Sequence, residues 1–271
     1  MSDTQVALVT GASGTIGRAI AAELGARGAA LMITGRRRDV LEAVAGELRD
    51  RGVRVKTAVG DVADPAHVED AVARAQAAFG PVTTLVNNAG GASAVGLSVS
   101  DSDPLAWRDT LLANVYGPYL FARAVLPGML AAKQGRIITV ASRAGTAVIP
   151  GAADYVVAKT AVIRLSENIA AETRGTGVVA FSLHPGGVAS GPVEAAIEQG
   201  RVTRDRFPDS PEAAARMVAD LADGKHDVLS GAYLDVHDDL AALTAAHRGE
   251  PTRILRVVDL PAEWQARPFT G

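Results

Sequence analysis

The 271-residue sequence predicts a single doubly wound α/β domain, with a seven-stranded, mainly parallel sheet and helices on both faces. Short apolar runs rich in Val, Ile and Leu alternate along the chain with longer segments of helical periodicity. Strands that are buried on both faces of a parallel sheet have this composition. The alternation runs from about residue 5 to residue 236 without a linker, a low-complexity tract or an internal repeat. Helices packed on both faces of one sheet produce this pattern.

The first half of the chain is expected to supply four strands, at Gln5–Gly11, Ala30–Thr34, Val53–Val59 and Thr83–Val86. The helices between them are expected from the glycine-rich turn to about Arg27, over Asp39–Arg51, and from Asp64-Pro65 to about Phe79. Asp39 and Asp64 are predicted N-caps, because an Asp side chain accepts hydrogen bonds from the free amides of the first turn. Proline at position 65 fits the first turn of a helix.

The second half is expected to supply the other strands, at Arg136–Ala141, Val178–Leu183 and Gly231–Val236. Its predicted helices begin at Asp103-Pro104, at about Ala152 and at Ser210-Pro211. The first of these is expected to kink near Gly117-Pro118, the second to end near Thr173 and the third near Leu221. The domain is predicted to span residues 1–238, and residues 239–271 form an extension with a short helix at Asp239–His247 and an extended segment at Ile254–Val258. An apolar extension of this kind is expected to pack on the domain or on a neighbouring subunit.

Composition excludes several functional classes. A net charge of −3 with scattered basic residues gives no case for nucleic-acid binding. The absence of cysteine excludes disulfides and thiolate metal sites. The five histidines lack metal-binding spacing and are expected at the surface or at strand ends. No apolar run approaches the ~18 residues of a membrane span. The chain begins without a basic or apolar leader, so we expect a cytoplasmic protein.

The segment from Ser142 to Lys159 carries the motif Y-x-x-x-K, with Tyr155 and Lys159 one helical turn apart on one face. A lysine ammonium about 4 Å from a phenolate would stabilise it by roughly 4 kcal/mol at an effective dielectric of ~20. This would bring the tyrosine pKa from about 10 towards neutrality, where a general acid/base works best. Ser142 could donate a hydrogen bond to the same substrate oxygen. Taken alone, the motif is better explained as a chance pair on an amphipathic helix.

The turn Thr10–Gly17 (TGASGTIG) lies between the first predicted strand and the first predicted helix. Glycines allow a ligand to approach the backbone closely, and a helix N-terminus offers amides and a positive dipole to a pyrophosphate. The spacing differs from the G-x-G-x-x-G dinucleotide fingerprint. A dinucleotide site is favoured over a tight turn without a ligand.

The second strand is followed by Gly35, where many dinucleotide folds carry an acid for the ribose hydroxyls. Arginines follow it instead, and their charge and fork geometry suit a 2′-phosphate. Arg36 is the first candidate for that contact and Arg37 the second. NADP(H) is therefore favoured and NAD(H) remains possible; the alternative is a turn of solvated arginines.

Together these motifs resemble the short-chain dehydrogenase/reductase family, in its ~250-residue type, a size that one hydrophobic core can support. The matching residues are TGASGTIG (10–17), Asp61-Val62, NNAG (87–90), Asn114 in NVYG, Ser142 with Tyr155 and Lys159, and HPGGVAS (184–190). The resemblance implies a Rossmann-type fold. It also implies Tyr155 as the general acid/base, Lys159 as the residue that lowers its pKa and holds the nicotinamide ribose, and Ser142 as the residue that orients the substrate oxygen. Asn114 would hold a water that links Lys159 to solvent, unless it is only a helix-kink residue.

The same resemblance implies the cofactor contacts. They are Gly11, Ser13, Thr15, Ile16 and Gly17 at the pyrophosphate, Arg36 and Arg37 at the 2′-phosphate, Asp61 and Val62 at the adenine, Asn88, Ala89 and Gly90 beneath the cofactor, and Pro185, Gly186, Val188 and Ser190 at the nicotinamide, with Tyr155 and Lys159. Asn88 would mainly tie neighbouring strands together. Asp61 could instead be a simple turn residue, and Ser190 stands where the family commonly has threonine.

The predicted function is an NADP(H)-preferring oxidoreductase that moves a hydride between the nicotinamide and a small-molecule ketone or secondary alcohol. The alternatives are an NAD(H)-linked alcohol dehydrogenase, a dinucleotide-binding protein without turnover, and an epimerase or dehydratase like the family's longer members. The predicted substrate walls are Gly91–Asp103, Arg143–Asp154 and Gly191–Pro208, with a substrate loop at about 188–208. Their arginines, at 143, 201, 204 and 206, could attract an anionic substrate or belong to a solvated lid. From the resemblance we also expect a homo-oligomer, a tetramer or dimer, through the helices near 104–131 and 152–173.

Overall fold

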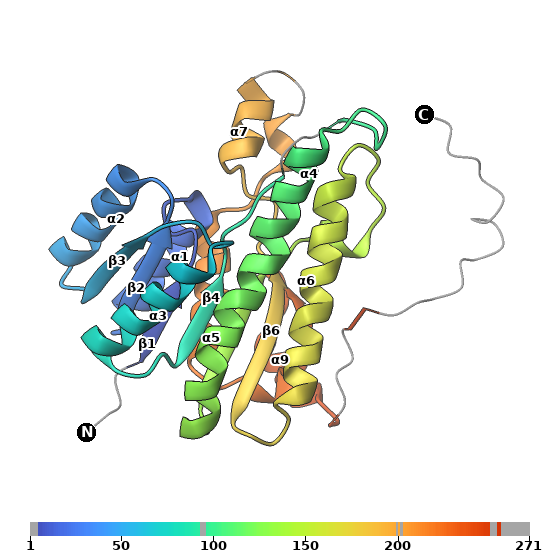
Figure 1. Cartoon of the computed structure of the whole chain (residues 1–271). Helices are drawn as coiled ribbons and strands as arrows, with labels where there is room; N and C mark the ends of the chain where they lie inside the picture. Colours follow the sequence, from blue (N-terminus) through green and yellow to red (C-terminus); the bar gives the residue numbers. More distant parts are fainter. Residues whose placement is uncertain (1–4, 93–95, 199, 201–202, 250–253, 256–271) are drawn as a thin grey trace.

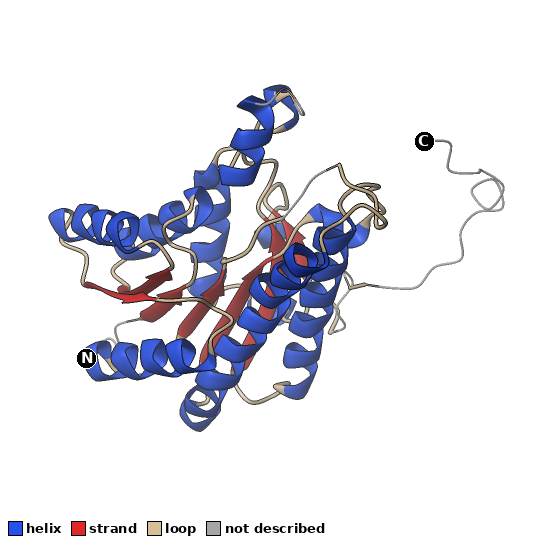
Figure 2. Ribbon diagram, turned by 45° about the horizontal axis from the view of Figure 1, so that its top comes forward, coloured by secondary structure: helices blue, strands red, loops and turns tan. Residues whose placement is uncertain are grey.

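A twisted sheet runs through the centre of the computed structural model, with helices on both of its faces (Figures 1 and 2). The structure describes residues 5–92, 96–198, 200, 203–249 and 254–255. The strands are β1 (Val6–Val9), β2 (Ala30–Gly35), β3 (Val55–Val59), β4 (Thr84–Asn87), β5 (Gly135–Val140), β6 (Val178–His184) and β7 (Tyr233–Asp235). Their order is β3-β2-β1-β4-β5-β6-β7. Every pairing in the sheet is parallel, so the prediction of a mainly parallel sheet is sharpened to an all-parallel one.

Alternating side chains of each strand supply two separate hydrophobic cores. In β1, Ala7 and Val9 face the core beneath α1 (Thr15–Ala26), α2 (Arg38–Asp50) and α8 (Pro211–Ala222). Val6 and Leu8 face the core beneath α3 (Pro65–Phe79), α5 (Gly117–Ala132) and α6 (Ala153–Glu172). Because side chains alternate along a strand, a continuous apolar run serves both faces.

The strand order reverses between β1 and β4, which are direct neighbours although β2 and β3 lie between them in the sequence. In open α/β sheets, ligands bind beyond the carboxyl ends of the strands at such a switch point. The helix α7 (Gly191–Glu198) also stands beyond these strand ends, away from both helix layers (Figure 1). The fold therefore predicts a ligand site at this edge of the sheet.

The long predicted helix from Asp103 is interrupted by a π-helical turn. It consists of α4 (Pro104–Leu111), the π-turn η1 (Leu112–Tyr116) and α5, and the Asp103 side chain accepts a hydrogen bond from the Leu105 amide at 3.0 Å. At the end of the π-turn, the Gly117 amide donates to the Leu112 carbonyl, five residues back. Pro118 has no amide to donate to the Asn114 carbonyl four residues before it. The irregularity expected near positions 117 and 118 is thus a π-turn centred on Asn114.

Several helix starts differ in detail from the predictions. Asp64 caps α3 as expected and accepts from the Ala66 amide at 3.0 Å. Asp39 does not cap α2, because the helix begins one residue earlier with Arg37 at the N-cap, which leaves Asp39 in the first turn. An acid there still interacts favourably with the helix dipole. His67 is not a surface residue but is 8% exposed, since the first turns of α3 pack it against Phe121.

The extension beyond β7 starts with the predicted helix, α9 (Leu240–Ala246), capped by Asp239. Leu240 is buried in the core beneath α1 and α8. Farther along, the Leu255 amide donates to the Glu167 carboxylate at 2.6 Å, and the Leu255 carbonyl accepts from Arg164 at 2.6 Å. This part of the extension therefore contacts α6. Of the predicted segment Ile254–Val258, residues 254–255 form no strand, and the rest lies outside the described residues.

Candidate active site

The four predicted catalytic side chains come from three elements on one side of the sheet. Asn114 lies in the π-turn, Ser142 follows the carboxyl end of β5, and Tyr155 and Lys159 lie in the first two turns of α6. The helix containing the π-turn and α6 run side by side (Figures 1 and 2). The π-turn and the first turns of α6 thus face each other beyond β5.

Lys159 is buried, with 5% of its surface exposed. Its Nζ donates to the Val140 carbonyl at 2.9 Å and lies 5.5 Å from the centre of the Tyr155 ring. Burial lowers the pKa of Lys159 from 10.5 to about 8, because an ammonium is less stable away from water. The side chain still carries a charge at neutral pH and places it beside the face of the tyrosine ring.

The pKa of Tyr155 differs from the prediction. Burial raises it above 10, and the hydrogen bond with Ser142 only partly offsets this rise. The prediction of a lowered pKa is wrong for this geometry, because Lys159 lies over the ring face and directs a hydrogen bond to Val140 instead of the phenol oxygen. Tyr155 is therefore held in its protonated form. In this form the phenol carries a proton that it can donate.

Asn114 is 1% exposed, and its amide nitrogen makes two hydrogen bonds. Nδ2 donates to the Gly91 and Thr110 carbonyls, each at 2.9 Å. Oδ1 is buried without a hydrogen-bond partner among the described residues. A buried carbonyl oxygen with no partner is costly, so this atom is suited to accept from a small polar molecule. π-turns are frequent at functional sites, and this one turns Asn114 inward.

The glycine turn forms a tight cradle after β1. Gly11 has a φ of +66°, and a Cβ on it would lie 2.8 Å from the Ala89 Cα. A Cβ on Gly17 would lie 2.4 Å from the Gly11 carbonyl oxygen. The first turn of α1 has no side-chain cap at Gly14. This cradle fits a pyrophosphate, because it combines close backbone approach with open amides at a helix N-terminus.

Asn88 and Thr10 fasten that turn to the end of β4. Asn88 Nδ2 donates to the Thr10 and Gly11 carbonyls at 2.9 and 3.2 Å, which is the structural tie expected of it. Thr10 Oγ1 accepts from the amides of Asn88 and Ala89, each at 3.0 Å. Sequence reasoning did not assign a role to Thr10. A threonine at the end of a buried strand was the only available signal, and it is a weak one.

The end of β2 leaves its arginines at the surface. Gly35 is buried, and a Cβ on it would lie 2.9 Å from Ser13 Oγ in the glycine turn. Arg36, Arg37 and Arg38 are exposed, and none has an ion pair among the described residues. Guanidinium groups that lie beside the cradle and have no ion pair among the described residues can bind a phosphate by donating hydrogen bonds to it. Asp61 is exposed beyond β3. Its Oδ1 accepts a hydrogen bond from the Ala63 amide at 2.9 Å, which is the contact expected if Asp61 is a simple turn residue.

The turn after β6 contains Pro185, Gly186 and Val188, which are all buried. Gly186 has a φ of +84°, so a side chain there would strain the backbone. Ser190 is half-buried, and its carbonyl accepts from the Glu194 amide at 2.8 Å at the start of α7. The turn therefore connects the strand end directly to α7.

The described part of the predicted substrate walls contains short helices. The loop at 191–208 contains α7 and a short 3-10 helix at Arg204–Arg206, which the sequence did not predict. The Gly96 amide donates to the Gly151 carbonyl at 2.8 Å and joins two of the wall loops. Arg143 pairs with Asp235 at 2.8 Å and Arg204 with Glu194 at 2.6 Å, while Arg201 lies outside the described residues. These ion pairs weaken the case for an anionic substrate.

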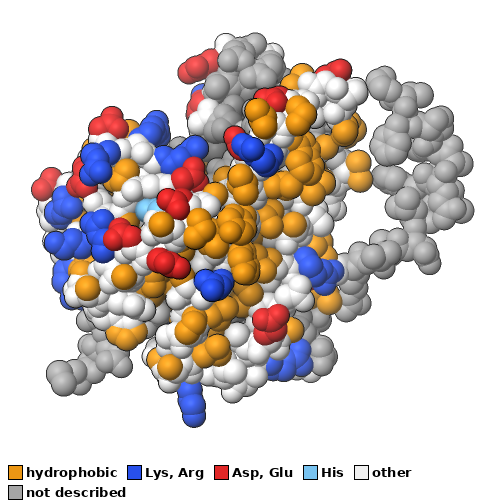
Figure 3. Space-filling view, viewed as in Figure 1, with side chains coloured by type: hydrophobic (Ala, Val, Ile, Leu, Met, Phe, Trp, Pro, Cys, Tyr) orange, Lys and Arg blue, Asp and Glu red, His pale blue; other side chains and the backbone are white. Residues whose placement is uncertain are grey.

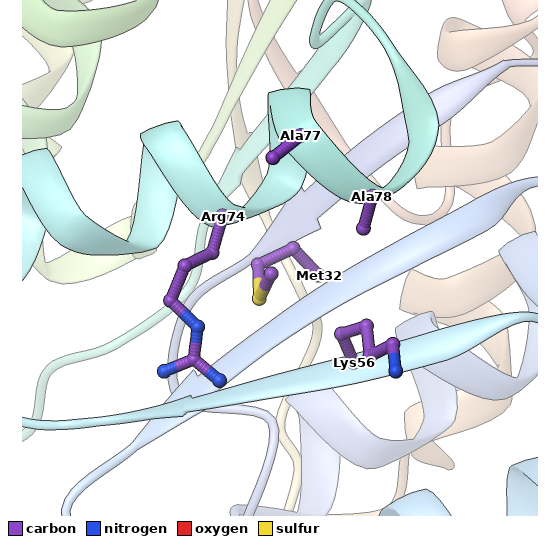
Figure 4. A pocket seen from close by; sticks show the side chains of 5 residues that line it. All are labelled: Met32, Lys56, Arg74, Ala77 and Ala78. Carbon is purple, nitrogen blue, oxygen red and sulfur yellow. The ribbon is translucent and has the colours of Figure 1, made fainter.

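One hollow among the described residues lies away from the predicted site. A hollow of about 320 Å³ lies between α3 and the edge of the sheet, lined by Met32, Lys56, Arg74, Ala77 and Ala78 (Figure 4). It contains none of the predicted site residues. Within the described part of the chain, no group of His, Asp and Glu could hold a metal ion. No helix in that part is long and apolar enough to cross a membrane.

Comparison with known proteins gives consistent results. The chain matches the family described as short chain dehydrogenase over residues 5–201. It is 36% identical over 243 residues to the short chain dehydrogenase mpl6 of Monascus purpureus, covering 88% of this chain and 82% of that one. It is 32% identical over 240 residues to the 3-oxoacyl-acyl-carrier-protein reductase FabG of Escherichia coli (strain K12), covering 86% and 96%. A variant of actinorhodin polyketide ketoreductase, crystallised with NADPH, superposes with a TM-score of 0.81 at 29% identity, covering 87% and 97%.

Proposed function

The chain belongs to the short-chain dehydrogenase/reductase family and is an NAD(P)-dependent oxidoreductase, and we propose that it transfers a hydride between NADP(H) and a ketone or secondary alcohol. The observation that carries this proposal is the pair of half-buried Tyr155 and buried Lys159, with Ser142 hydrogen-bonded to the tyrosine. A protein that only binds dinucleotides has no need of such an acid/base pair. The same pair argues against the alternative without turnover.

Tyr155 is the proposed proton donor in ketone reduction and the proton acceptor in alcohol oxidation. Its raised pKa keeps the phenol protonated at neutral pH, which is the form that donates the proton in the reductive direction. Ser142 would orient the substrate carbonyl towards the phenol. The bound nicotinamide would supply or accept the hydride. Lys159, whose ammonium lies 5.5 Å from the centre of the Tyr155 ring, would hold the nicotinamide ribose.

Proton resupply is the proposed task of Asn114. Its buried Oδ1 has no partner among the described residues, and its Nδ2 is held by two backbone carbonyls. A water on Oδ1 would satisfy this atom and lead from Lys159 towards solvent. The rigid anchoring of Nδ2 supports this role over that of a simple helix-kink residue, which needs no buried acceptor.

The preference for NADP(H) over NAD(H) is proposed from the surface beside the glycine cradle. Gly35 contributes no carboxylate, and Arg36 and Arg37 are exposed and free of ion pairs among the described residues. The NADPH bound by the actinorhodin ketoreductase supports the same cofactor class. Gly11, Ser13, Thr15, Ile16 and Gly17 would hold the pyrophosphate; the other proposed contacts are Asp61, Val62, Ala89, Gly90, Pro185, Gly186, Val188 and Ser190.

Ketones are the proposed substrates because two of the relatives named above are ketone reductases. FabG is a 3-oxoacyl reductase and the actinorhodin enzyme a polyketide ketoreductase. The exposed apolar side chains near the site, Leu97, Val99, Val148 and Ile149, suit a partly apolar ketone. The paired arginines described above give no support for a charged one.

The protein is also proposed to form a homo-oligomer. An apolar patch covers the faces of α4, α5 and α6 (Figure 3), and it includes the exposed side chains Leu105, Tyr116, Tyr119 and Val157. An exposed patch of this kind commonly marks a protein interface. The extension from residue 239 is proposed as a separate structural unit that packs on the domain through α9.

The experiment that tests the proposed function is a panel of ketones and secondary alcohols, followed by nicotinamide absorbance with each cofactor. We expect ketone-dependent oxidation of NADPH and slower turnover with NADH.

Arg36→Ala should weaken NADPH binding about tenfold or more and leave NADH binding unchanged, because only NADPH carries the 2′-phosphate. Arg38→Ala, an exposed arginine two residues further on, is the matched control. Tighter binding of NADH than of NADPH by the unmodified protein would contradict the proposed preference.

A further inference from the structure

Four charged side chains outside the proposed catalytic machinery form a chain across the strand ends. Arg143 Nη2 donates to Asp235 Oδ2 at 2.8 Å. His237 Nδ1 lies 2.7 Å from Asp235 Oδ1, and His237 Nε2 lies 3.0 Å from Asp209 Oδ1. Asp235 ends β7, and Asp209 directly precedes the N-cap of α8. The cluster therefore links segments that lie far apart in the sequence.

One end of this cluster is fixed to the turn after β6. Asp209 Oδ2 accepts from the Gly187 amide at 2.7 Å, and the Asp209 amide donates to the Gly187 carbonyl at 3.0 Å. A Cβ on Gly186 would lie 2.8 Å from the Asp209 Cβ, so the two segments are in close contact. The side chain of Asp209 is only 20% exposed. Its carboxylate therefore holds the Gly187 amide, in a turn that contains two consecutive glycines.

The other end is fixed next to Ser142. Arg143, the following residue, donates its backbone amide to His184 Nδ1 at 3.2 Å. His184 is the last residue of β6 and directly precedes Pro185. The cluster thus connects the residue after Ser142 with the turn that follows β6, along two routes.

The charges of the cluster reinforce one another. Burial alone would raise the pKa of Asp235, but hydrogen bonds from Arg143 and His237 hold that pKa at about 2. Asp235 and Asp209 both raise the pKa of His237. Only an imidazolium can donate to both carboxylates at once, because a neutral ring has a single N–H. Burial lowers the pKa of His184, so its ring accepts from Arg143 as a neutral group.

We propose that Asp209 is a positioning residue for the nicotinamide end of the cofactor, which holds the turn Pro185–Val188 in place and is braced in turn by His237 and Asp235. The proposal rests on the proposed function, in which this turn receives the nicotinamide. Asp209 touches neither substrate nor cofactor in this role. It acts through the backbone of Gly187, whose glycine neighbour would otherwise leave the turn free to move.

The test compares two ligands that share one end. NADPH reaches the nicotinamide turn, whereas 2′,5′-ADP contains only the adenosine end. Asp209→Ala should weaken NADPH binding about tenfold or more, the loss expected for one charge-assisted hydrogen bond. The dissociation constant of 2′,5′-ADP should stay unchanged. Asp205→Ala is the matched control, since this exposed carboxylate makes no hydrogen bond with the described residues. It should alter neither constant.

A second variant keeps the test informative if Asp209→Ala does not fold. The side chain of His237 is 60% exposed, so His237→Ala is expected to fold and to give a smaller loss that is also confined to NADPH. Equal weakening of both ligands, or no weakening of either by a folded variant, would overturn the proposal. Failure of the unmodified protein to bind NADPH at all would overturn the proposed function itself and this inference with it.

Discussion

At Lys159, folding and chemistry place opposite demands on a single ammonium group. Burial lowers its pKa to about 8, while the proposed chemistry needs its charge beside Tyr155. The hydrogen bond from Nζ to the Val140 carbonyl compensates only part of the lost hydration. Perturbed groups of this kind gather at functional sites because function, not stability, requires them.

Lys159→Met should therefore stabilise the fold while it abolishes turnover. The drop in pKa from 10.5 to about 8 corresponds to roughly 3 kcal/mol against folding at neutral pH. The sign follows from the lowered pKa of a base: the cost is complete below pH 8 and disappears as pH rises towards 10.5. Met also leaves the Val140 carbonyl unpaired, so the net gain should be about 1–2 kcal/mol at pH 7. Urea denaturation of both proteins at several pH values measures it. A variant that is less stable than the unmodified protein at pH 7, or equally more stable at all pH values, would contradict this account.

The residue scale also marks a limit of sequence reasoning. The motif spacing and the strand ends predicted that Ser142, Tyr155 and Lys159 lie close together, as they do in the structure. It did not predict the direction of the Tyr155 pKa, which depends on burial and on where Lys159 directs its hydrogen bond. Thr10 and Asp209 were missed for a related reason. Their partners are backbone groups of segments distant in the sequence, and no spacing reveals them.

At the scale of elements, the π-turn between α4 and α5 decides how Asn114 is presented. Gly117 follows it and packs against Val62, where a Cβ would lie 2.8 Å from Val62 Cγ2. Val62 is 7% exposed and lies beyond β3, at the proposed adenine contact. Close packing at this glycine thus ties the helix to the cofactor side of the sheet.

Gly117→Ala should destabilise the protein by about 1–2 kcal/mol, because Val62 has little room to move and overpacking is costly. Gly128→Ala in the same helix is the matched control, since its Cβ would meet only Gln76 Nε2, at 3.8 Å. That variant should gain up to about 1 kcal/mol from helix propensity. Thermal and urea denaturation measure both changes. Equal effects of the two substitutions would show that the contact with Val62 has no energetic role.

Sequence patterns found the regular elements well and the irregular ones poorly. Each predicted strand lies within two residues of its observed start, since buried parallel strands have a distinctive composition. The helix α7 was expected as loop because its segment begins with Gly191-Pro192 and is short. The type of irregularity near Gly117 also could not be predicted, because proline and glycine signal a disturbance without specifying a π-turn.

For the whole molecule, the apolar patch on α4, α5 and α6 is the feature that an isolated domain does not explain (Figure 3). Tyr116 and Tyr119 stack on its surface with ring centres 6.0 Å apart. Both side chains remain exposed, at 38% and 43%. A second copy of the chain would bury these two side chains without any change to the sheet or to the turns proposed to bind the cofactor.

Tyr119→Glu should therefore lower the oligomeric mass, because a charge within an apolar interface is desolvated on association. Val228→Glu introduces the same charge at a side chain that is 51% exposed and lies outside the patch. It should leave the mass unchanged. Size-exclusion chromatography with light scattering measures both variants. If the unmodified protein is monomeric, or if the Tyr119→Glu variant keeps the same oligomeric mass, this interface does not form.

The central claim, that Tyr155 supplies the proton in an NADP(H)-dependent ketone reduction, is tested most directly by Tyr155→Phe. This variant removes the phenol oxygen and keeps the ring beside Lys159. We predict an unchanged fold, an NADPH dissociation constant within about threefold of the unmodified value, and turnover reduced at least ~100-fold, the lower range for a general acid. Tyr119→Phe is the control and should keep full activity. Retained turnover in Tyr155→Phe, with NADPH still bound, would contradict the claim.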